Sequence, residues 1–513
     1  MRPAAASKKV LRRHRPPGII AAMIANHPSN ASGDGLSRRK FILLSAMAAG
    51  GMAAGGCATP RAKPRLISPN EKLNVAIVGY GGQGASDAGA FGNENVIALC
   101  DADKTVGARV KSMYPKAAYY QDFRKMLDNE KTLDALNIAV PDHLHAYIAA
   151  AAMQMGKHVY VQKPLAHSVY EARLLRKLAA KYKVATQMGN QGSAAPGFRS
   201  GVEVIQSGLI GQVHDVYVWS NRPIWPQGLP RPEGEDPVPE GLDWDLWIGP
   251  APMRPYKGKN PSASRQYPNY YHTFNWRGWI DFGTGALGDM ACHTCNLPFR
   301  GLKLGYPTEI EAETVDLTKD CYPIKSNIRF QFPAREGLDP LTFRWYDGGK
   351  RNPDATGGQY HDGNNKPPAE VTADLRGSYP RLPGSGCLIV GEKGQIFSES
   401  DYGTSFMIKL KDEKEFSNGL QHPAVQSIPQ TIPRNTLGGR DSHHQEWIAA
   451  CKGGPAAYSN FDIAAYLTEI MVLGCVAMRA GKKLEWDGPN MRAKNCPEAS
   501  QFVHPEFRKG WKI

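Results

Sequence analysis

The sequence predicts an α/β protein whose first folded domain, residues 71–190, is a doubly wound parallel sheet. Short apolar runs rich in β-branched residues alternate with helix-compatible stretches, and a glycine-rich turn follows the first run. Units of this length connect parallel strands by right-handed crossovers. The 513 residues are 42% hydrophobic and 21% charged, with a mean hydropathy of −0.43. Such values are typical of globular proteins and exclude a polytopic membrane protein, a collagen and a disordered chain.

The predicted elements follow one another in a regular order. They are a strand at 73–78, a glycine-rich turn at 79–84, a helix at 85–91, a strand at 96–100, a strand at 133–140, a loop at 141–145 opening a helix that runs to 155, a strand at 157–161, an amphipathic helix at 168–181 and a strand at 184–188. In such a sheet, ligands bind beyond the carboxyl ends of the strands. The turn 79–84, Asp101, the loop 141–145 and the segment 162–164 all fall at those ends.

The turn Gly79-Tyr80-Gly81-Gly82-Gln83-Gly84 has the spacing of a dinucleotide-binding fingerprint and lies between a strand and a helix. Glycine there lets the backbone approach a pyrophosphate at the helix N-terminus. Asp101 ends the second strand, where a carboxylate accepts hydrogen bonds from a ribose 2′-hydroxyl and repels a 2′-phosphate. The fingerprint therefore predicts NAD rather than NADP as the cofactor. Asp103 is interpreted as a cap for the next helix.

The net charge of +14 is concentrated at the N-terminus. Residues 1–40 hold nine Lys or Arg and one acidic residue, and residues 41–56 hold no charge. The pair Arg38-Arg39, followed by Lys40, Phe41 and an apolar stretch, has the features of a twin-arginine export signal. An uncleaved anchor or a fortuitous arginine pair are the alternatives. The remaining charge is modest, and since no basic stripe interleaved with aromatic residues occurs in it, a nucleic-acid partner is not expected.

Residues 1–57 are therefore predicted to be an export signal, and residues 58–70 a tether rich in proline and basic residues. Ala54-Gly55-Gly56-Cys57 is a loose lipobox that makes Cys57 a candidate for lipidation, although the usual leucine is missing. Met1 and Met23 are both possible starts. We expect an exported, periplasmic protein that contacts a membrane only through its signal or a lipid on Cys57.

Three motifs together carry a family resemblance. They are Gly156-Lys157-His158-Val159-Tyr160-Val161-Gln162-Lys163-Pro164-Leu165, after Pro141-Asp142-His143-Leu144-His145; the run from Trp276 to His293; and Leu484-Glu485-Trp486-Asp487 with Arg508-Lys509-Gly510-Trp511. With them, the chain resembles the Gfo/Idh/MocA oxidoreductases (glucose–fructose oxidoreductase, inositol dehydrogenase and relatives) over residues 71–513. The family usually has Glu-Lys-Pro at the strand end, and here Gln162 replaces the glutamate.

The resemblance implies a Rossmann domain followed by a second α/β domain, residues 191–513, with an open, mostly antiparallel sheet. That sheet walls the substrate pocket and often forms an oligomer interface, so we expect a homo-oligomer, a dimer or a tetramer. The family's catalytic lysine, aspartate and histidine fall on Lys163, Asp289 and His293. Further cofactor contacts are expected at Pro141, His143, His145, Gln162 and Lys163, and substrate contacts at Trp276, Arg277 and Asn190.

The chemistry of these residues suits alcohol oxidation. Asp289 and His293 are four residues apart and lie on one face of a helix. A histidine of ordinary pKa near 6.5 can act as a general base at neutral pH, and the Lys163 ammonium can stabilise a developing alkoxide. Without the resemblance, the same spacing would indicate a solvated helix pair or a capping arrangement. His143 and His145 either contact the nicotinamide ribose, His145 more than His143, or only open the helix.

Other clusters have simpler interpretations. Cys292 and Cys295 are interpreted as helix-packed thiols, because no second Cys/His cluster follows at zinc-finger spacing, and no metal is expected. Eight cysteines remain after Cys57, and an exported protein could pair some of them. His443 and His444 follow Asp441-Ser442 and are interpreted as part of a capped helix start.

The segment 221–275 is rich in aromatic residues among many Pro and Gly. It holds Arg222, Trp225, Trp244, Trp247, Tyr267, Tyr270, Tyr271 and His272. Any single ring is more simply a packing anchor for the loop, but as a group they favour a carbohydrate or polyol ligand. The segment is predicted to form a lid over the pocket or a subunit contact.

The sequence therefore predicts an exported, NAD-dependent oxidoreductase acting on a secondary hydroxyl of a sugar, glycoside or cyclitol, with tightly bound cofactor. One alternative is a redox-neutral glycoside hydrolase that oxidises its sugar transiently, eliminates the glycosidic bond and reduces the product. A second is a non-catalytic sugar-binding lipoprotein.

Overall fold

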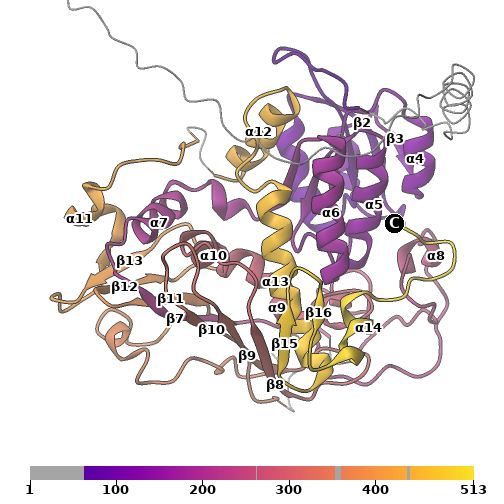
Figure 1. The fold of residues 1–513 in the computed structure, drawn as a ribbon. Coiled ribbons are helices and arrows are strands. Elements are labelled where there is room, and N and C mark those ends of the chain that lie inside the picture. Colours follow the sequence, from indigo (N-terminus) through magenta and orange to yellow (C-terminus); the bar gives the residue numbers. More distant parts are fainter. Residues whose placement is uncertain (1–62, 262, 353–359, 436–438) are drawn as a thin grey trace, which may run out of the picture. The chain divides into compact units, whose positions relative to one another are not determined.

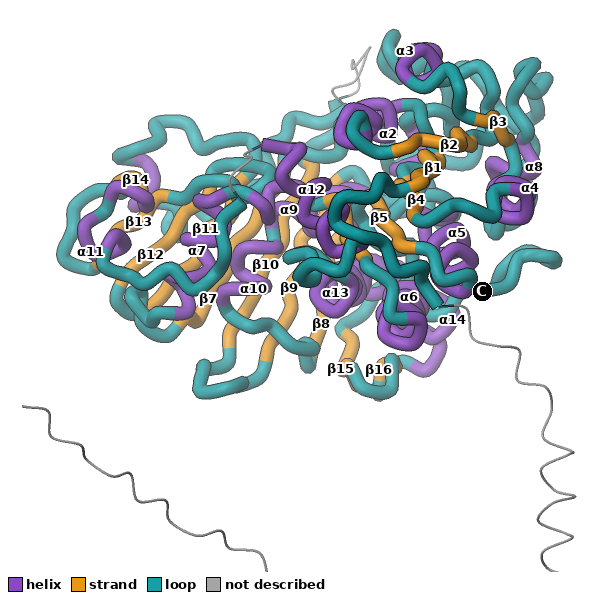
Figure 2. The backbone as a smooth tube through the Cα atoms, turned by 90° about the horizontal axis from the view of Figure 1, so that it is seen from above, coloured by secondary structure: helices purple, strands orange, loops and turns teal. Residues whose placement is uncertain are grey.

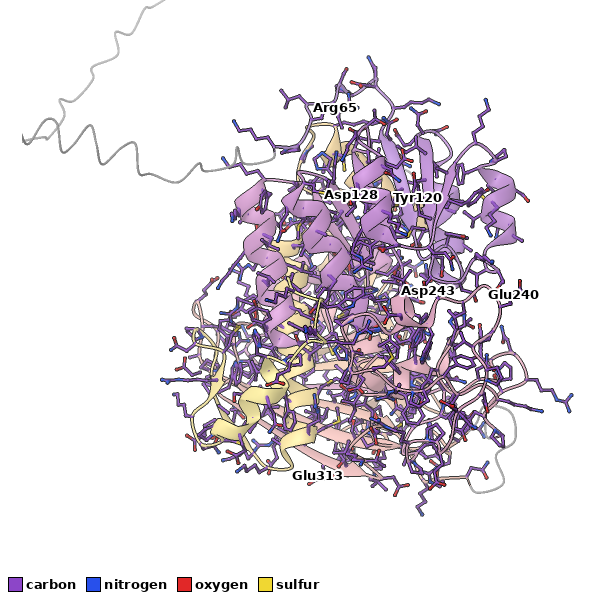
Figure 3. The ribbon with its side chains drawn as sticks, turned by 90° about the vertical axis from the view of Figure 1, so that its right-hand side faces the viewer. Arg65, Tyr120, Asp128, Glu240, Asp243 and Glu313 are labelled. Atoms are coloured by element: carbon purple, nitrogen blue, oxygen red, sulfur yellow. The ribbon has the colours of Figure 1, made fainter. Side chains whose placement is uncertain are left out.

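The computed structural model describes residues 63–261, 263–352, 360–435 and 439–513. The predicted export signal, residues 1–57 with Cys57, and residues 58–62 of the predicted tether lie outside the described residues. Residues 63–70 of that tether run along the first domain, and Figure 3 shows where Arg65 lies. Nε of Arg65 donates to a carboxylate oxygen of Asp134 at 2.8 Å. Ile67 is buried among the apolar residues around Leu73.

The first domain is a six-stranded, fully parallel sheet in the order β3-β2-β1-β4-β5-β6. The strands are β1 (Asn74–Val78), β2 (Asn95–Cys100), β3 (Ala118–Tyr120), β4 (Ala135–Ile138), β5 (His158–Gln162) and β6 (Thr186–Gly189). This is the strand order of a dinucleotide-binding Rossmann sheet. The predicted α/β class and doubly wound sheet are confirmed.

Two helices of this domain begin at a residue whose side chain caps them, Asp122 and Ser168. The helices of the domain are α2 (Gly82–Asp87), α3 (Ala108–Met113), α4 (Phe123–Asn129), α5 (Asp142–Gln154) and α6 (Val169–Tyr182), with the 3₁₀ turn η1 (Ala88–Phe91) after α2. Ser168 and Glu171 form a reciprocal capping box at the start of α6, which fixes where that helix begins. Helix α5 starts directly after Pro141, so His143 and His145 lie in its first turn and not in a loop.

The second domain is built on a ten-stranded sheet in the order β14-β13-β12-β11-β7-β10-β9-β8-β15-β16. Its strands are β7 (Val213–Ser220), β8 (Glu309–Val315), β9 (Lys325–Phe332), β10 (Leu341–Gly348), β11 (Gly386–Gly391), β12 (Gly394–Ser398), β13 (Met407–Leu410), β14 (Ser417–Asn418), β15 (Leu484–Asp487) and β16 (Arg492–Ala493). Among the paired strands of the described residues, β7 and β10 run parallel and the others antiparallel. The mostly antiparallel sheet is thereby confirmed.

Helices cover one face of this second sheet (Figure 2). The helices outside the first domain are α7 (Pro196–Gln206), α8 (Trp244–Ile248), α9 (Gly285–Thr294), α10 (Asn296–Gly301), α11 (Pro423–Gln426), α12 (Gly439–Cys451), α13 (Phe461–Ala480) and α14 (Ser500–Val503), and the 3₁₀ turns are η2 (Gln191–Ala194), η3 (Asn275–Gly278), η4 (Ala373–Arg376), η5 (Gly419–Gln421) and η6 (Pro497–Ala499).

Helix α13 is the central element of the core. It packs against α6 of the first domain and against α9 and β8 of the second (Figure 1). Asn460 caps its start by accepting from the Asp462 N–H at 3.0 Å, and Gly481 ends it with φ of +64°. By length and composition α13 could cross a membrane, but most of it is buried among the other helices. It therefore joins the two sheets through one apolar core, which sets α9 beside the edge where the first sheet ends.

Candidate active site

The glycine-rich turn between β1 and α2 is fixed by close backbone contacts. A Cβ built on Gly79, whose φ is +76°, would lie 2.6 Å from the carbonyl oxygen of Ala139. A Cβ on Gly84 would lie 1.8 Å from the carbonyl oxygen of Gly79, whereas one on Gly82 would meet nothing within 4 Å. The turn is thus closely packed on one side and open on the other. Bare backbone facing open space at a helix start is the arrangement that accepts a pyrophosphate.

A cleft of about 750 Å³ opens at the carboxyl ends of the first sheet's strands. Most of the predicted cofactor residues line it, together with two of the predicted substrate residues: Gly79, Gly81, Gly82, Gln83, Asp101, Pro141, His145, Gln162, Lys163, Trp276 and Arg277. Tyr80, Gly84, His143, Asn190, Asp289 and His293 are described but lie outside that lining. The cleft thus gathers most of the predicted cofactor residues, and the other predicted site residues lie outside its lining.

Asp101 lies at the end of β2 on the cleft wall. Its Oδ1 accepts from the backbone N–H of Asp103 at 3.0 Å, and burial raises the pKa of the Asp101 carboxyl to about 6. It is therefore mostly ionised at neutral pH. Asp103 does not cap α3, whose N-cap is Gly107. Its carboxylate instead accepts from Thr105 and lies 2.9 Å from Nε2 of His272 in the aromatic segment.

Lys163, Asp289 and Arg277 meet where the two domains join. Nζ of Lys163, at the end of β5, donates to Oδ1 of Asp289 on α9 at 2.8 Å. Nε of Arg277 donates to the same oxygen at 3.2 Å. Although burial alone would raise the pKa of Asp289, these two cations hold it well below its usual range. A carboxylate that stays ionised thus fixes an ammonium group at the inner end of the cleft.

Arg277 is held in place by aromatic rings as well as by Asp289. Its guanidinium carbon lies 4.3 Å from the ring centroid of Trp276, 4.5 Å from that of Phe274 and 5.7 Å from that of Trp225. Nη1 also donates to the carbonyl oxygen of Phe274 at 3.1 Å. The aromatic segment therefore orients a cation beside the predicted catalytic lysine.

His293 lies one turn after Asp289 on α9, as the four-residue spacing predicts. Its imidazole is 3% exposed and meets the edge of the Tyr402 ring, with 4.6 Å between centroids. Asn190, after β6, donates its amide to the carbonyl oxygen of Cys292 at 3.2 Å. Its buried Oδ1 has no hydrogen-bond partner among the described residues. Sequence reasoning did not single out Tyr402, whose ring is 39% exposed beside the predicted base.

The two histidines of the first turn of α5 occupy different places. His145 lines the cleft and bridges two loops, its ring nitrogens lying 2.7 Å from the carbonyl oxygen of Pro164 and 2.8 Å from that of Val140. Burial lowers the pKa of His145 to about 4. His143 lies instead between the carbonyl oxygens of Phe282 (3.2 Å) and Trp247 (3.0 Å).

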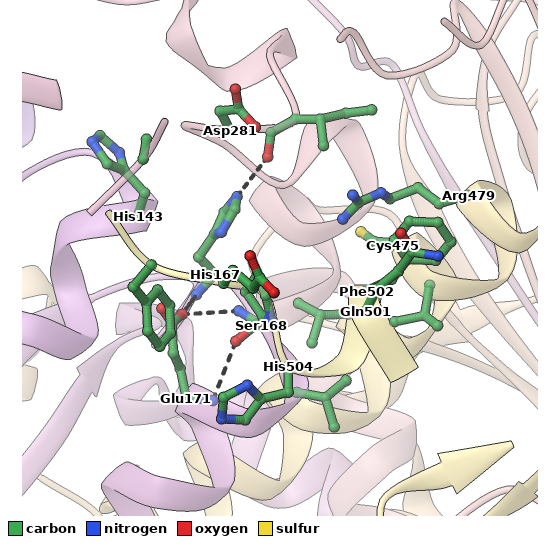
Figure 4. Close-up of a pocket in the computed structure, with 18 of the residues that line it drawn as sticks. His143, His167, Ser168, Glu171, Asp281, Cys475, Arg479, Gln501, Phe502 and His504 are labelled. Carbon is green, nitrogen blue, oxygen red and sulfur yellow. Dashed lines mark hydrogen bonds between the residues drawn. The ribbon is translucent and has the colours of Figure 1, made fainter. Parts of the chain in front are cut away.

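His143 borders a second cavity of about 750 Å³, formed by the start of α6, the end of α13 and the segment around α14 (Figure 4). His167 lies between the carbonyl oxygens of Ile280 and Gly283, each at 2.9 Å from its Nε2. The Arg479 guanidinium stacks on the Phe502 ring at 4.1 Å. This cavity lies apart from the lining of the dinucleotide cleft, although His143 and Asp142 are neighbours in the chain.

Asp142 lines the cleft and belongs to the motif at 141–145, but the sequence predicted no role for it. It is buried at the start of α5, and its carboxyl accepts from the hydroxyl of Thr284 at 2.7 Å. Burial raises the pKa of Asp142 to about 7. A buried carboxyl of raised pKa close to Lys163 and Arg277 marks Asp142 as a candidate functional residue, and only the structure reveals this environment.

The aromatic segment 221–275 is mainly a packed cluster. Trp244, Trp247, Tyr256 and Tyr271 are buried against one another, as expected of packing anchors. Its members that reach the cleft are Leu246, Trp247, Tyr267, His272, Thr273 and Phe274.

His443 and His444 lie within α12 and are buried against the first domain, where His444 stacks on Tyr160. The eight described cysteines are all buried and unpaired. No group of three or more His, Cys, Asp or Glu that could hold a metal occurs among the described residues.

The fold and cleft define a class of protein: one with a Rossmann dinucleotide site whose inner end is completed by a helix of a second domain. Two family models match in succession. Residues 73–190 match the oxidoreductase family with an NAD-binding Rossmann fold, and residues 204–333 match the C-terminal α/β domain of the same family. The chain belongs to the Gfo/Idh/MocA oxidoreductase family.

Similar proteins include a glycosyl hydrolase family 109 protein of Shewanella amazonensis, 29% identical over 27% of this chain and 35% of that protein. A levoglucosan dehydrogenase of Pseudarthrobacter phenanthrenivorans is 23% identical over 28% of this chain and 39% of that protein. The chain thus spans little more than a third of the length of either relative. The WlbA dehydrogenase of Bordetella pertussis, solved with NADH and UDP-GlcNAcA, superposes with a TM-score of 0.54 at 15% identity over 83% of this chain and 99% of that one.

Proposed function

We propose that the chain is an NAD-dependent oxidoreductase that oxidises or reduces a secondary hydroxyl of a sugar, glycoside or cyclitol. The observation that carries the proposal is the meeting of Lys163 and Asp289, from two domains, at 2.8 Å where the dinucleotide cleft ends. An ammonium group fixed there suits a substrate oxygen that gains negative charge. The relatives named as a levoglucosan dehydrogenase and a glycosyl hydrolase support a carbohydrate substrate.

The residues present fit NAD. Gly81 and Gly82 present bare backbone toward the cleft for a pyrophosphate, and Asp101 presents a carboxylate for ribose hydroxyls. Gln162 and Lys163 line the far end, where the nicotinamide ring would be held. When bound, NAD supplies the ring carbon that accepts a hydride from the substrate.

We assign the acid–base and positioning steps of the reaction to side chains of the protein. In the oxidation direction His293 takes the hydroxyl proton as general base, and the substrate C–H bond gives its electron pair as hydride. Lys163 donates a hydrogen bond to the oxygen that becomes a carbonyl, and Asp289 holds that ammonium in position. We assign substrate contacts to Trp276, Arg277 and Asn190. The buried Oδ1 of Asn190 has no hydrogen-bond partner among the described residues and can accept from a sugar hydroxyl.

The proposal is tested on the purified protein. Bound nucleotide is released and identified, and a panel of sugars, glycosides and cyclitols is screened for a change in nicotinamide absorbance. We expect NAD or NADH and a spectral change with at least one carbohydrate. A protein that carries no nicotinamide nucleotide and binds none refutes the proposal.

The matched family 109 glycosyl hydrolase favours one second candidate, a redox-neutral glycoside hydrolase that uses the same residues. Incubation with p-nitrophenyl glycosides separates the two functions. Release of nitrophenol without net NADH supports the hydrolase, and net NADH from a free sugar supports the dehydrogenase.

The preference for NAD over NADP is part of the proposal. It rests on the Asp101 carboxylate, which is ionised above pH 6 and repels a 2′-phosphate. NADH is expected to bind more tightly than NADPH at pH 8, and Asp101→Asn is expected to narrow that difference by about tenfold.

We further propose that the protein is exported to the periplasm as a homo-oligomer, with Cys57 a candidate lipid anchor. Replacing Arg38 and Arg39 with lysine should retain the protein in the cytoplasm if the arginine pair is the signal. Light scattering of the mature protein gives the oligomer, for which a dimer or a tetramer is expected.

A further inference from the structure

A buried carboxylate lies directly behind the dinucleotide cleft. Asp87, the last residue of α2, is 2% exposed. Its Oδ1 accepts from the side-chain amide of Gln83 at 2.8 Å, and its Oδ2 accepts from that of Gln162 at 2.7 Å. The amide of Asn137 donates to Oδ2 at 3.4 Å, and Nε2 of His444 lies 3.7 Å from Oδ1. Four side chains from four separate elements thus converge on one carboxyl group.

The surroundings of Asp87 are unusual because they contain no strong cation. Among the described residues no lysine or arginine pairs with it, and the one basic group within 4 Å of its oxygens is the His444 imidazole. A buried carboxylate is tolerated only when its oxygens accept hydrogen bonds. Asp87 therefore requires that the amides of Gln83 and Gln162 present their N–H groups inward, which fixes the direction in which both carboxamides point.

Both glutamines also belong to the cleft. Gln83 is part of the glycine-rich turn, and Gln162 directly precedes Lys163; each lines the cavity. The carboxamide of Gln162 lies against Gly189, where a Cβ would be only 2.3 Å from its Oε1. Asp87 on one side and Gly189 on the other therefore hold one orientation of this side chain.

This arrangement accounts for the departure of the sequence from the Glu-Lys-Pro pattern. A glutamate at position 162 would place a second carboxylate at hydrogen-bond distance from Asp87, with no donor between them, and two ionised carboxylates that close repel one another. A glutamine keeps the shape and supplies the donor that Asp87 needs. The negative charge that the pattern puts on the strand end is carried here by α2.

We propose that Asp87 is a positioning residue for the cofactor cleft, acting through Gln162 on the strand end that carries Lys163 and through Gln83 on the phosphate-binding turn. The proposal rests on the proposed function in one respect, that the cleft holds NAD. Helix α12, far along the chain, completes the network: His444 stacks on Tyr160 of β5 with 4.4 Å between centroids and faces Asp87.

The test is a double-substitution cycle read by NADH binding, which needs no knowledge of the sugar. Gln162→Glu should weaken NADH binding about tenfold or more at pH 8, and less at pH 5.5, where one of the two carboxyls takes up a proton. Asp87→Asn alone should weaken it about threefold to tenfold, because an asparagine turns one donor toward the glutamines. The variant with both changes restores one carboxylate and one carboxamide, in reverse order, and should bind within about threefold of the unaltered protein.

Gln121→Glu is the matched control. Gln121 also lines the cleft, but its amide donates to the carbonyl oxygens of Ala102 and Gly241 and not to Asp87. Asp87→Asn should therefore fail to rescue it. Melting temperatures of all variants, taken without nucleotide, should follow the same cycle and show that each variant folds.

Two results overturn the proposal: unchanged NADH binding by Gln162→Glu at both pH values, or losses in the double variant that equal the product of the single losses. Failure of the unaltered protein to bind NADH would instead refute the proposed function. Once a substrate is known, kcat and KM of the same variants can be measured. A loss in kcat would indicate that Lys163 is displaced, and a loss in cofactor affinity would indicate that the glycine-rich turn is displaced.

Discussion

Asp289→Asn is the substitution whose consequences follow most directly from the structure. It removes the carboxylate that pairs with Lys163 and Arg277 while keeping the shape of the side chain. Two charge-assisted hydrogen bonds end on the same oxygen, and each such bond contributes about 1.5–3 kcal/mol. An amide oxygen still accepts weakly, and the three side chains are 10–21% exposed. The expected loss in the free energy of unfolding is therefore about 2–4 kcal/mol at pH 7.

The loss should depend on pH with a defined sign. The pKa of Asp289 is lower in the folded protein than in the unfolded chain, so its contribution is fully present above the unfolded value of about 4 and is lost as the pH falls toward the folded value. The difference between the unaltered protein and Asp289→Asn should therefore shrink between pH 7 and pH 3. Urea unfolding at the two pH values, followed by tryptophan fluorescence, measures it.

A matched control is the exposed pair of Lys303 and Glu336, whose atoms lie 2.9 Å apart. Glu336→Gln should leave unfolding unchanged, because exposed pairs contribute little. Equal stability of Asp289→Asn and the unaltered protein at pH 7, or an equal loss at both pH values, would refute the assignment of Asp289 as the counter-ion of the two cations.

Three further predictions test the cleft. His293→Asn should lower kcat by about 10²–10⁴ while NADH binding stays within about twofold, and an equal loss in NADH binding would contradict the role of general base. Burial raises the pKa of Asp142 to about 7, so between about pH 4 and pH 7 the folded carboxyl keeps a proton that the unfolded one has released, and the unaltered protein loses stability as the pH rises. Asp142→Asn should lack this loss, so its melting temperature relative to that of the unaltered protein should be higher at pH 8 than at pH 4. A melting-temperature difference that is the same at both pH values would contradict the prediction. Gly84→Ala should abolish tight NADH binding, because its Cβ would lie 1.8 Å from the Gly79 carbonyl oxygen, whereas Gly89→Ala, whose Cβ meets nothing within 4 Å, should bind NADH normally.

The first domain could be read from the sequence because its signals are local. The apolar run before Gly79 and the glycine spacing each act within a few residues and stand where they were expected. The Ser168/Glu171 capping box, which the sequence analysis did not predict, is equally local and starts the helix that was expected at 168–181. The second sheet could not be derived from local patterns, and its prediction rested on the family resemblance. Its ten strands pair residues far apart, such as β7 with β10, so no short pattern sets their order.

Single residues in the site show the same division. The spacing of Asp289 and His293 placed both on α9, but no spacing predicts that Asp289 accepts from Lys163, 126 residues earlier. His143 stands one residue from a cleft residue and still faces another cavity, because successive helical positions point about 100° apart. Motifs identify such residues as candidates, and packing decides which of them reach the ligand.

The replaced glutamate illustrates why a departure from a family pattern needs the structure to be understood. Read along the chain, Gln162 has lost a charge next to the predicted catalytic lysine. In the folded protein a carboxylate lies next to Gln162, because Oδ2 of Asp87 on α2 accepts from Nε2 of Gln162 at 2.7 Å. Because the donor and the acceptor lie 75 residues apart, the sequence alone does not reveal that Gln162 and Asp87 are partners. What is retained is one negative charge between the phosphate-binding turn and the strand end that carries Lys163, and the double-substitution cycle measures how far cofactor binding depends on it.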